Sequence, residues 1–379
     1  MSKKGLYFPN LNGLRFIAAF MVILHHYQFS RAVDTENFYG KFVMGIGKLG
    51  VMLFFTLSGF LITYLLLTEK EVTQTVDIKK FYIRRILRIW PLYYLIVLSA
   101  LFILNNFIYT EIPGISGAMI HQQFGLKCVL FLCMLPNIAM AKGLSLPFAD
   151  QAWSIGVEEQ FYLFWPLLIK KTTNAFRPLL VIIIAYISLK IIFTVLAHHF
   201  PNNNTLQQVT YLISLSCFDV MAVGGLAAFI LFNKHKVLDI LFSNPLQLVV
   251  FIATPLLMVL NINFGFFQYE VYGLLFAVII INLAGNKNVI LNLENKLLHY
   301  LGKISYGLYM YHLLGIRLEE LVVYKCPFLK NYWVSFLLIM AITIGLSALS
   351  YELFEKIFIK RKIRFSNIIS GDNYLAKEQ

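Results

Sequence analysis

Ten apolar runs, each long enough to cross a bilayer, constrain this chain more than any other feature. About 20 apolar residues in a helix span the hydrocarbon core, which is about 30 Å thick. The runs lie at about residues 10–29, 50–68, 91–109, 152–169, 178–198, 209–232, 245–261, 266–284, 298–316 and 332–356. Since 59% of the residues are hydrophobic and only 13% are charged, we predict an all-α, polytopic integral membrane bundle of about ten transmembrane helices. One membrane domain is expected over residues 1–365, with a short tail over 366–379.

The basic residues between these runs predict the orientation. The net charge is +13, but the lysines and arginines form short clusters beside the apolar runs, which is typical of the positive-inside rule and not of a nucleic-acid-binding protein. With ten spans and both termini cytoplasmic, 21 basic residues face the cytoplasm and eight face outward. An eleventh run, 128–140, has the length of a re-entrant or interfacial segment. If it crossed, Lys170 and Lys171 would face outward, against the rule. The four cysteines have no metal-site spacing, so no metal is predicted.

The first run, LNGLRFIAAFMVILHHYQF, carries ionisable groups in a segment that should cross the membrane. An ionisable side chain there costs about 2.5 to 3.5 kcal/mol by insertion scales, which favours a functional role. Eleven helical steps bring His26 to within about 20° of Arg15 and about 16 Å further along the axis. His25 points about 80° away from Arg15. The alternative to a functional role is that Arg15 reaches the lipid headgroups and that His26 is bonded to a backbone carbonyl.

A basic cluster precedes the third run, in KKFYIRRILRIWPLYY. Arg84, Arg85 and Arg88 are in helical register, and Arg85 and Arg88 are neighbours on one face. Guanidinium groups bind phosphates through paired hydrogen bonds, so a nucleotide or coenzyme A would suit this cluster. The alternative to a ligand site is that these arginines only set the membrane orientation of the chain and contact anionic lipid.

Two carboxylates begin the fourth run, in WSIGVEEQFYLFWP. Glu158 and Glu159 point about 100° apart on a helix, so only one of them is expected to face the bundle. The start of a helix favours acidic residues, which suffices to explain Glu159. A carboxylate near His26 would orient the imidazole ring and raise its basicity.

Polar residues in two further runs could line a site. LGKISYGLYMYHLL places Ser305, Tyr306, Tyr309 and His312 in one stripe, and an interfacial aromatic belt does not explain His312. Ser58 lies in GKLGVMLFFTLSGFLIT, whose glycines and serine are better explained by close helix packing. Lys190 and Asp219 are intramembrane charges with no obvious partner in the sequence.

Seven stretches resemble, in order, the membrane-bound acyltransferase family of the acyltransferase-3 type, bacterial proteins of about ten spans that acylate envelope glycans and lipids. The resemblance covers about residues 10 to 360. The stretches are NGLRFIAAFMVILHH, GVMLFFTLSGFLIT, FYIRRILRIWPLYY, WSIGVEEQFYLFWP, FDVMAVGGLAA, LGKISYGLYMYH and SYELFEK. The family often has arginine two residues before the aspartate of the FD motif, where this chain has Cys217, so the partner of Asp219 is open.

The resemblance implies an O-acyltransferase, which transfers groups other than amino-acyl groups. Acyl-CoA, most often acetyl-CoA, would be the cytoplasmic donor. The acceptor would be a hydroxyl of an envelope saccharide or lipid at the outer face of a bacterial plasma membrane. Arg15 and His26 match the family's Arg-x10-His, Arg85 and Arg88 its Arg-x-x-Arg, and Glu158 the glutamate of WSxxxE. His25 is not the family histidine.

Acyl-CoA binding is therefore expected at Arg15, Arg85 and Arg88, and catalysis at His26 and Glu158. His26 would act either as general base or as transient acyl carrier, with Glu158 orienting it. The esterase-like domain fused to some members is not expected, so acylation would occur within the membrane domain or through a separate envelope-polymer assembly protein. The rival interpretations are a secondary transporter or flippase, and a non-catalytic scaffold.

Overall fold

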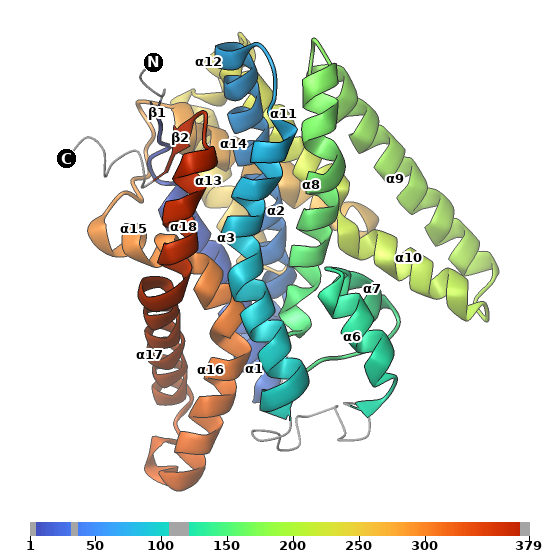
Figure 1. The fold of residues 1–379 in the computed structure, drawn as a ribbon, viewed down its shortest axis with the longest axis vertical. Helices are drawn as coiled ribbons and strands as arrows, with labels where there is room; N and C mark the ends of the chain where they lie inside the picture. Colours follow the sequence, from blue (N-terminus) through green and yellow to red (C-terminus); the bar gives the residue numbers. More distant parts are fainter. Residues whose placement is uncertain (1–4, 32–36, 106–120, 372–379) are drawn as a thin grey trace.

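The computed structural model describes residues 5–31, 37–105 and 121–371, and this part of the chain is almost entirely helical (Figure 1). The first half contains α1 (Leu11–Ser30), α2 (Phe38–Thr73), α3 (Ile78–Ser99) continued by a π-helical segment (Ala100–Leu104), α6 (Phe124–Leu132), α7 (Pro136–Ala141), a 3-10 turn (Asp150–Ala152), α8 (Trp153–Lys171) and α9 (Phe176–His199). The second half contains α10 (Asn204–Ser216), α11 (Phe218–Phe232), α12 (Val237–Leu241), α13 (Asn244–Val259), α14 (Gln268–Gly285), α15 (Lys296–Lys303), α16 (Ser305–Lys325), α17 (Tyr332–Ser350), a π-helical segment (Tyr351–Glu355) and α18 (Lys356–Lys362), with 3-10 turns at Gly265–Phe267, Pro327–Leu329 and Ile363–Phe365.

The helices are those of a membrane bundle. Six helical stretches in the described residues are long and apolar enough to cross a membrane: Phe38–Thr73, Ile78–Leu104, Phe176–His199, Asn204–Phe232, Gly265–Gly285 and Tyr332–Phe365. Three more helices, α1, α8 and α16, have 20, 19 and 21 residues. At about 1.5 Å per residue these also match the bilayer core, but they are more polar. They are the helices that carry His26, Glu158 and His312.

Two short strands join the ends of the described chain. Strand β1 (Gly5–Leu6) pairs in parallel with β2 (Ile369–Ser370). This pairing brings the segment before α1 against the segment after α18, on the same face of the bundle (Figure 1).

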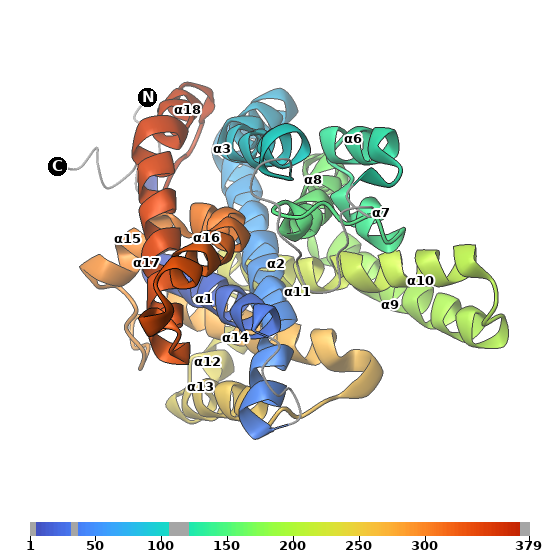
Figure 2. The same cartoon turned by 90° about the horizontal axis from the view of Figure 1, so that it is seen from below.

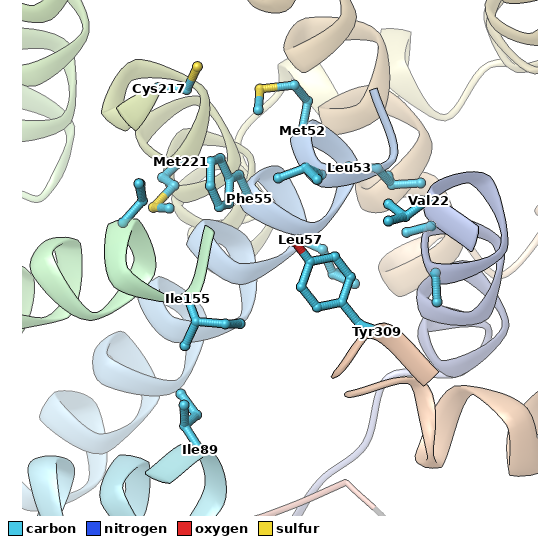
Figure 3. Close-up of a cluster of buried hydrophobic side chains, with 14 of the residues drawn as sticks. Val22, Met52, Leu53, Phe55, Leu57, Ile89, Ile155, Cys217, Met221 and Tyr309 are labelled. Carbon is cyan, nitrogen blue, oxygen red and sulfur yellow. The ribbon is translucent and has the colours of Figure 1, made fainter. Parts of the chain in front are cut away.

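Helix α2 is central and packs against α1, α8, α11 and α14 (Figure 2). It crosses α11 closely because each helix has a glycine at the crossing. A Cβ atom on Gly59 would lie 1.9 Å from the Met221 carbonyl oxygen, and one on Gly224 would lie 1.9 Å from the Thr56 carbonyl oxygen. Beside this crossing, Phe55 packs next to Met221 (Figure 3). The packing role predicted for the glycines of α2 follows directly from this geometry.

Replacing Gly224 with alanine is expected to destabilise the protein by about 1 to 3 kcal/mol, because α2 and α11 must move apart. Helix propensity alone would favour alanine by about 1 kcal/mol. Gly345→Ala in α17 is the matched control, since a Cβ there meets nothing within 4 Å. Thermal unfolding in detergent measures both changes. An unfolding midpoint for Gly224→Ala equal to that of Gly345→Ala would contradict the close crossing.

Several boundaries differ from those predicted. The third predicted run begins at residue 91, but α3 already begins at Ile78 and contains Pro91. Its start is capped by the Asp77 side chain, which accepts a hydrogen bond from the Lys80 backbone N–H at 3.0 Å. This hydrogen bond holds the pKa of the Asp77 carboxyl below its usual value. The arginine cluster is therefore helical and continuous with the third span.

Three predicted runs are divided. Run 128–140 falls in α6 and α7, which at about 1.5 Å per residue are too short to cross. Run 209–232 is broken at Cys217, where φ is 39°, so that α10 packs on α9 and extends from the bundle while α11 packs on α2 (Figure 2). Run 298–316 is broken at Ile304, between α15 and α16.

The helices around Cys217 supply the partners that the sequence did not reveal for Lys190 and Asp219. The Lys190 ammonium of α9 pairs with the Glu270 carboxylate of α14 and donates to the Phe266 carbonyl at 3.0 Å. Asp219 lies 2% exposed beside this pair and interacts with both charges. A buried ion pair of this kind ties α9 to α14 across α11.

Candidate active site

A cavity of about 300 Å³ opens beside the β1–β2 strands and runs into the bundle between α1, α2, α3, α8, α16 and α18. Such a volume is at the lower end of the range of small-molecule sites. Eight residues predicted from the sequence line it: Arg15, Ser58, Arg85, Arg88, Glu158, Ser305, Tyr306 and Tyr309. These residues come from five helices, and the fold brings them to one site.

The three arginines of the predicted phosphate-binding cluster lie along the first turns of α3. The Arg85 guanidinium lies over the Tyr162 ring, 5.3 Å from its centroid, and 5.7 Å from that of Phe81. Arg85 and Arg88 make no hydrogen bond or ion pair with any residue that the structure describes. Arg84 differs, because it pairs with the Glu69 carboxylate at 2.8 Å. Two of the three arginines are therefore available to a ligand.

Glu158 belongs to a hydrogen-bonded set in the wall of the cavity. Its carboxylate accepts a hydrogen bond from the Tyr162 hydroxyl at 3.0 Å, and that hydroxyl also bonds to the Ser58 hydroxyl. The charges of Arg85 and Arg15 act on Glu158. Sequence analysis missed Tyr162, although its position one helical turn after Glu158 was a usable signal.

Glu159 points elsewhere, as the helical geometry predicted for one of the two glutamates. Its carboxylate accepts a hydrogen bond from the Trp90 indole N–H at 3.1 Å. This contact joins α8 to α3 beside the cavity. Glu159 is therefore a packing residue, and Glu158 is the member of the pair that lines the site.

His26 lies beyond the inner end of the cavity and is not among its lining residues. Its Nδ1 is 2.9 Å from the Val22 carbonyl oxygen, to which it donates. This contact assigns the proton to Nδ1 and leaves the Nε2 lone pair without a partner in the described residues. His25 instead places Nδ1 3.3 Å from the Val43 carbonyl of α2. The tautomer of His26 is the one that a general base requires.

Two residues of α16 separate His26 from the cavity. The His312 ring lies 4.8 Å from the His26 ring, centroid to centroid, and the Tyr309 ring lies 5.9 Å from His312. His312 is fully buried; its Nδ1 donates to the Tyr309 carbonyl at 2.6 Å, and its Nε2 has no hydrogen-bond partner among the described residues. The Tyr309 hydroxyl bonds to that of Ser154 at 2.8 Å. Tyr309 points toward α2 beside Leu57 (Figure 3).

The expected contact between Glu158 and His26 is absent. Both side chains are in the described part of the chain, but His26 is oriented by the Val22 carbonyl and Glu158 by Tyr162. The physical reason is that the residues of α16 occupy the space between them. Glu158 therefore stands at the inner cavity wall with Arg85, apart from the imidazole pair.

The cavity has a strong excess of positive charge. Six cationic side chains line it, against two acidic ones. The cations are Arg15, Arg84, Arg85, Arg88, Lys303 and Lys362, and the acids are Glu69 and Glu158. Like charges gathered around a partly desolvated space repel one another, so an anionic ligand is the natural occupant. Within the described residues, no group of three or more His, Cys, Asp and Glu side chains could hold a metal ion.

The fold defines a multi-pass membrane protein, and the cavity within its helices has an excess of positive charge. Residues 8–352 match the model of a family described as the acyltransferase domain. The chain belongs to this family, which confirms the resemblance found in the motifs.

Relatives with assigned or suggested activities cover most of this chain. The peptidoglycan O-acetyltransferase OatA of Listeria monocytogenes is 30% identical over 96% of this chain and 57% of its own length. A putative O-acetyltransferase of Staphylococcus aureus (strain COL) is 25% identical over 96% of this chain and 59% of its own length. The chain thus spans somewhat more than half of these relatives. No solved structure matches.

Proposed function

We propose that this protein transfers an acyl group, acetyl in particular, from cytoplasmic acyl-CoA to a hydroxyl of an envelope saccharide or lipid at the outer face of the bacterial plasma membrane. The observation that carries the proposal is the cavity with six cations and two acids, in a chain of the acyltransferase family. Acyl-CoA is an acyl donor with several phosphates, and guanidinium groups suit them. The relatives named as peptidoglycan and other O-acetyltransferases favour acetyl and a saccharide acceptor.

The proposed topology has ten spans with both termini in the cytoplasm. The β1–β2 pairing supports it, because it joins the two ends of the described chain on one face, as an even number of crossings requires. The arginines of α3 line the cavity at this same face. On the positive-inside rule that face is cytoplasmic, which is where acyl-CoA is found.

In this proposal the donor enters beside the β1–β2 strands. Its phosphates contact Arg85, Arg88 and Arg15, and its apolar arm extends between α2, α8 and α16. The thioester then lies near Ser58, Glu158 and Tyr309 at the inner wall. Tyr309 and His312 form the layer that the thioester, still joined to coenzyme A, passes on its way to His26.

His26 performs the chemistry on the acceptor side. As a general base, its Nε2 removes the proton of the acceptor hydroxyl, whose oxygen attacks the acyl carbonyl. The carbon–sulfur bond breaks, and the thiolate of coenzyme A takes up a proton. As an acyl carrier, Nε2 attacks the acyl carbon and the carbon–sulfur bond breaks, which releases the thiolate. The hydroxyl oxygen then attacks the same carbon, the Nε2–carbon bond breaks, and Nε2 takes up the hydroxyl proton. Acyl-protein that accumulates in a single turnover and disappears in His26→Ala would select the second route.

The test uses purified protein in vesicles with labelled acetyl-CoA, and compares wild type, His26→Ala and Arg88→Ala. Release of coenzyme A and transfer of the label are measured together. Both should fall in the two variants, with donor affinity lost only in Arg88→Ala. Equal release and transfer in all three proteins would rule out the enzymatic mechanism and favour a scaffold.

A further inference from the structure

We propose that Lys362 binds a phosphate of the donor's nucleotide moiety, and so selects donors that carry the nucleotide over shorter thioesters. This inference rests on the proposed function, because it assumes an acyl-CoA donor. Lys362 is the last residue of α18 and lies six positions after the last of the seven stretches, SYELFEK, outside all of them. It lines the same cavity as Arg85 and Arg88.

The first argument is the environment of the Lys362 ammonium. It makes no hydrogen bond or ion pair with any residue that the structure describes. Its charge interacts instead with other cations, first with Arg88 and Arg85, then with Arg15 and Arg84. An ammonium held among guanidinium groups is electrostatically unfavourable without an anion. The arrangement is explained if a polyphosphate ligand completes it.

The second argument is the balance of charge. Six cations and two carboxylates line the cavity, an excess of four positive charges. A phosphate monoester carries about −1.5 to −2 near neutral pH. The 3′-phosphate and the diphosphate of coenzyme A together therefore carry nearly four negative charges. Without Lys362 and Lys303 the cavity would have an excess of only two.

The third argument is how the chain holds Lys362 in place. The segment after α18 is tied to α2 and α3 by side-chain contacts. Asn367 donates to the Glu69 carboxylate at 2.9 Å and accepts from the Lys80 ammonium at 3.1 Å. Arg84 donates to the Phe365 carbonyl at 2.9 Å and pairs with the same Glu69, which is 2% exposed.

These contacts give the C-terminal segment a defined position at the mouth of the cavity. Ser366, Ile368 and Gly371 line the cavity together with Lys362. The β1–β2 pairing closes the same end. Asn367 is thus a positioning residue, which acts by fixing the segment that presents Lys362 against the arginines of α3.

The experiment measures the affinity of the full chain in detergent for three donors: acetyl-CoA, 3′-dephospho-acetyl-CoA and S-acetylpantetheine, which lacks all phosphates. The proteins compared are wild type, Lys362→Met, Asn367→Ala and Lys360→Met. Lys360 is exposed on the same helix, so its variant controls for the loss of one charge. Binding of S-acetylpantetheine reports that each variant is folded around the inner cavity.

Lys362→Met should weaken binding of acetyl-CoA about tenfold to a hundredfold, as expected for one charge-assisted hydrogen bond. Binding of S-acetylpantetheine should not change, and Lys360→Met should match wild type. If Lys362→Met and wild type bind 3′-dephospho-acetyl-CoA equally well, Lys362 contacts the 3′-phosphate. If Lys362→Met still binds this donor more weakly than wild type does, Lys362 contacts the diphosphate. Asn367→Ala should show a smaller loss with the same dependence on phosphate.

Two results would overturn the inference. One is an affinity of Lys362→Met for acetyl-CoA equal to that of wild type; the other is an equal loss for all three donors, which indicates a structural role. A wild-type protein that binds none of the donors would overturn the proposed function itself. The two failures are distinguishable, because the first leaves wild-type binding of acetyl-CoA intact.

Discussion

Replacing His26 with glutamine is expected to lower the rate of acyl transfer about 10²- to 10⁴-fold, the usual contribution of a general acid–base group. The amide has no basic nitrogen, whereas the Nε2 of His26 is left free by the Nδ1 contact with Val22. Binding of acetyl-CoA should not change, because His26 does not line the donor cavity. Single-turnover transfer of label and equilibrium binding measure the two effects separately.

His25→Gln is the matched control for this prediction. His25 is the adjacent imidazole, but its hydrogen bond is to the α2 backbone at Val43, and it has no part in the proposed chemistry. The control should keep most of the activity. Loss of transfer in both variants to the same extent would indicate that the pair supports the α1–α2 packing and that His26 is not the catalytic group.

The double variant Arg85→Ala/Arg88→Ala is expected to weaken binding of acetyl-CoA about 10²- to 10⁴-fold. Each guanidinium makes charge-assisted hydrogen bonds worth about 1.5 to 3 kcal/mol, and the two should nearly add. Titration of acetyl-CoA against purified protein gives the affinity. Lys79→Ala/Lys360→Ala removes the same charge from exposed positions and should bind as wild type does.

The same double variant separates a ligand site from a structural cluster. Arg85 and Arg88 have no ion-pair partner among the described residues, so removing them relieves repulsion and breaks no salt bridge. The ligand-free variant should therefore unfold at the same temperature as wild type or higher. A marked loss of thermal stability together with unchanged donor affinity would contradict the assignment of these residues to the donor.

Helical periodicity was sufficient to find the residues on single helices. Arg15 with His26, Arg85 with Arg88, and the α16 stripe could all be grouped, because side chains three, four or eleven positions apart share a face. Intramembrane charge then marked them as functional. The structure confirms the helical membrane bundle and gathers six of these residues around one cavity.

Contacts between side chains of different helices could not be predicted from helical periodicity. Periodicity shows that Arg15 and His26 share a stripe but not that Tyr309 and His312 lie between His26 and the cavity. For the same reason the expected contact of Glu158 with His26 was wrong. Such contacts depend on α1, α8 and α16 packing together, which no single sequence window encodes.

Local breaks and long-range contacts were also missed. Cys217 adopts a left-handed conformation that divides one apolar run into α10 and α11, and neither residue preference nor hydropathy indicates this. Lys362 lies in a basic segment after the last span that looks like an ordinary topology signal. Its position beside Arg88 depends on Asn367 reaching Glu69, almost 300 positions away.

Sealed proteoliposomes of known orientation would test the central claim most directly, the transfer of the acyl group across the membrane. Labelled acetyl-CoA is supplied only on the face that carries the arginines of α3, and an N-acetylglucosamine oligosaccharide, as acceptor probe, only on the other. The account predicts ester-linked label on the oligosaccharide with wild type and almost none with His26→Gln. Label that forms only when donor and acceptor share one compartment would contradict it.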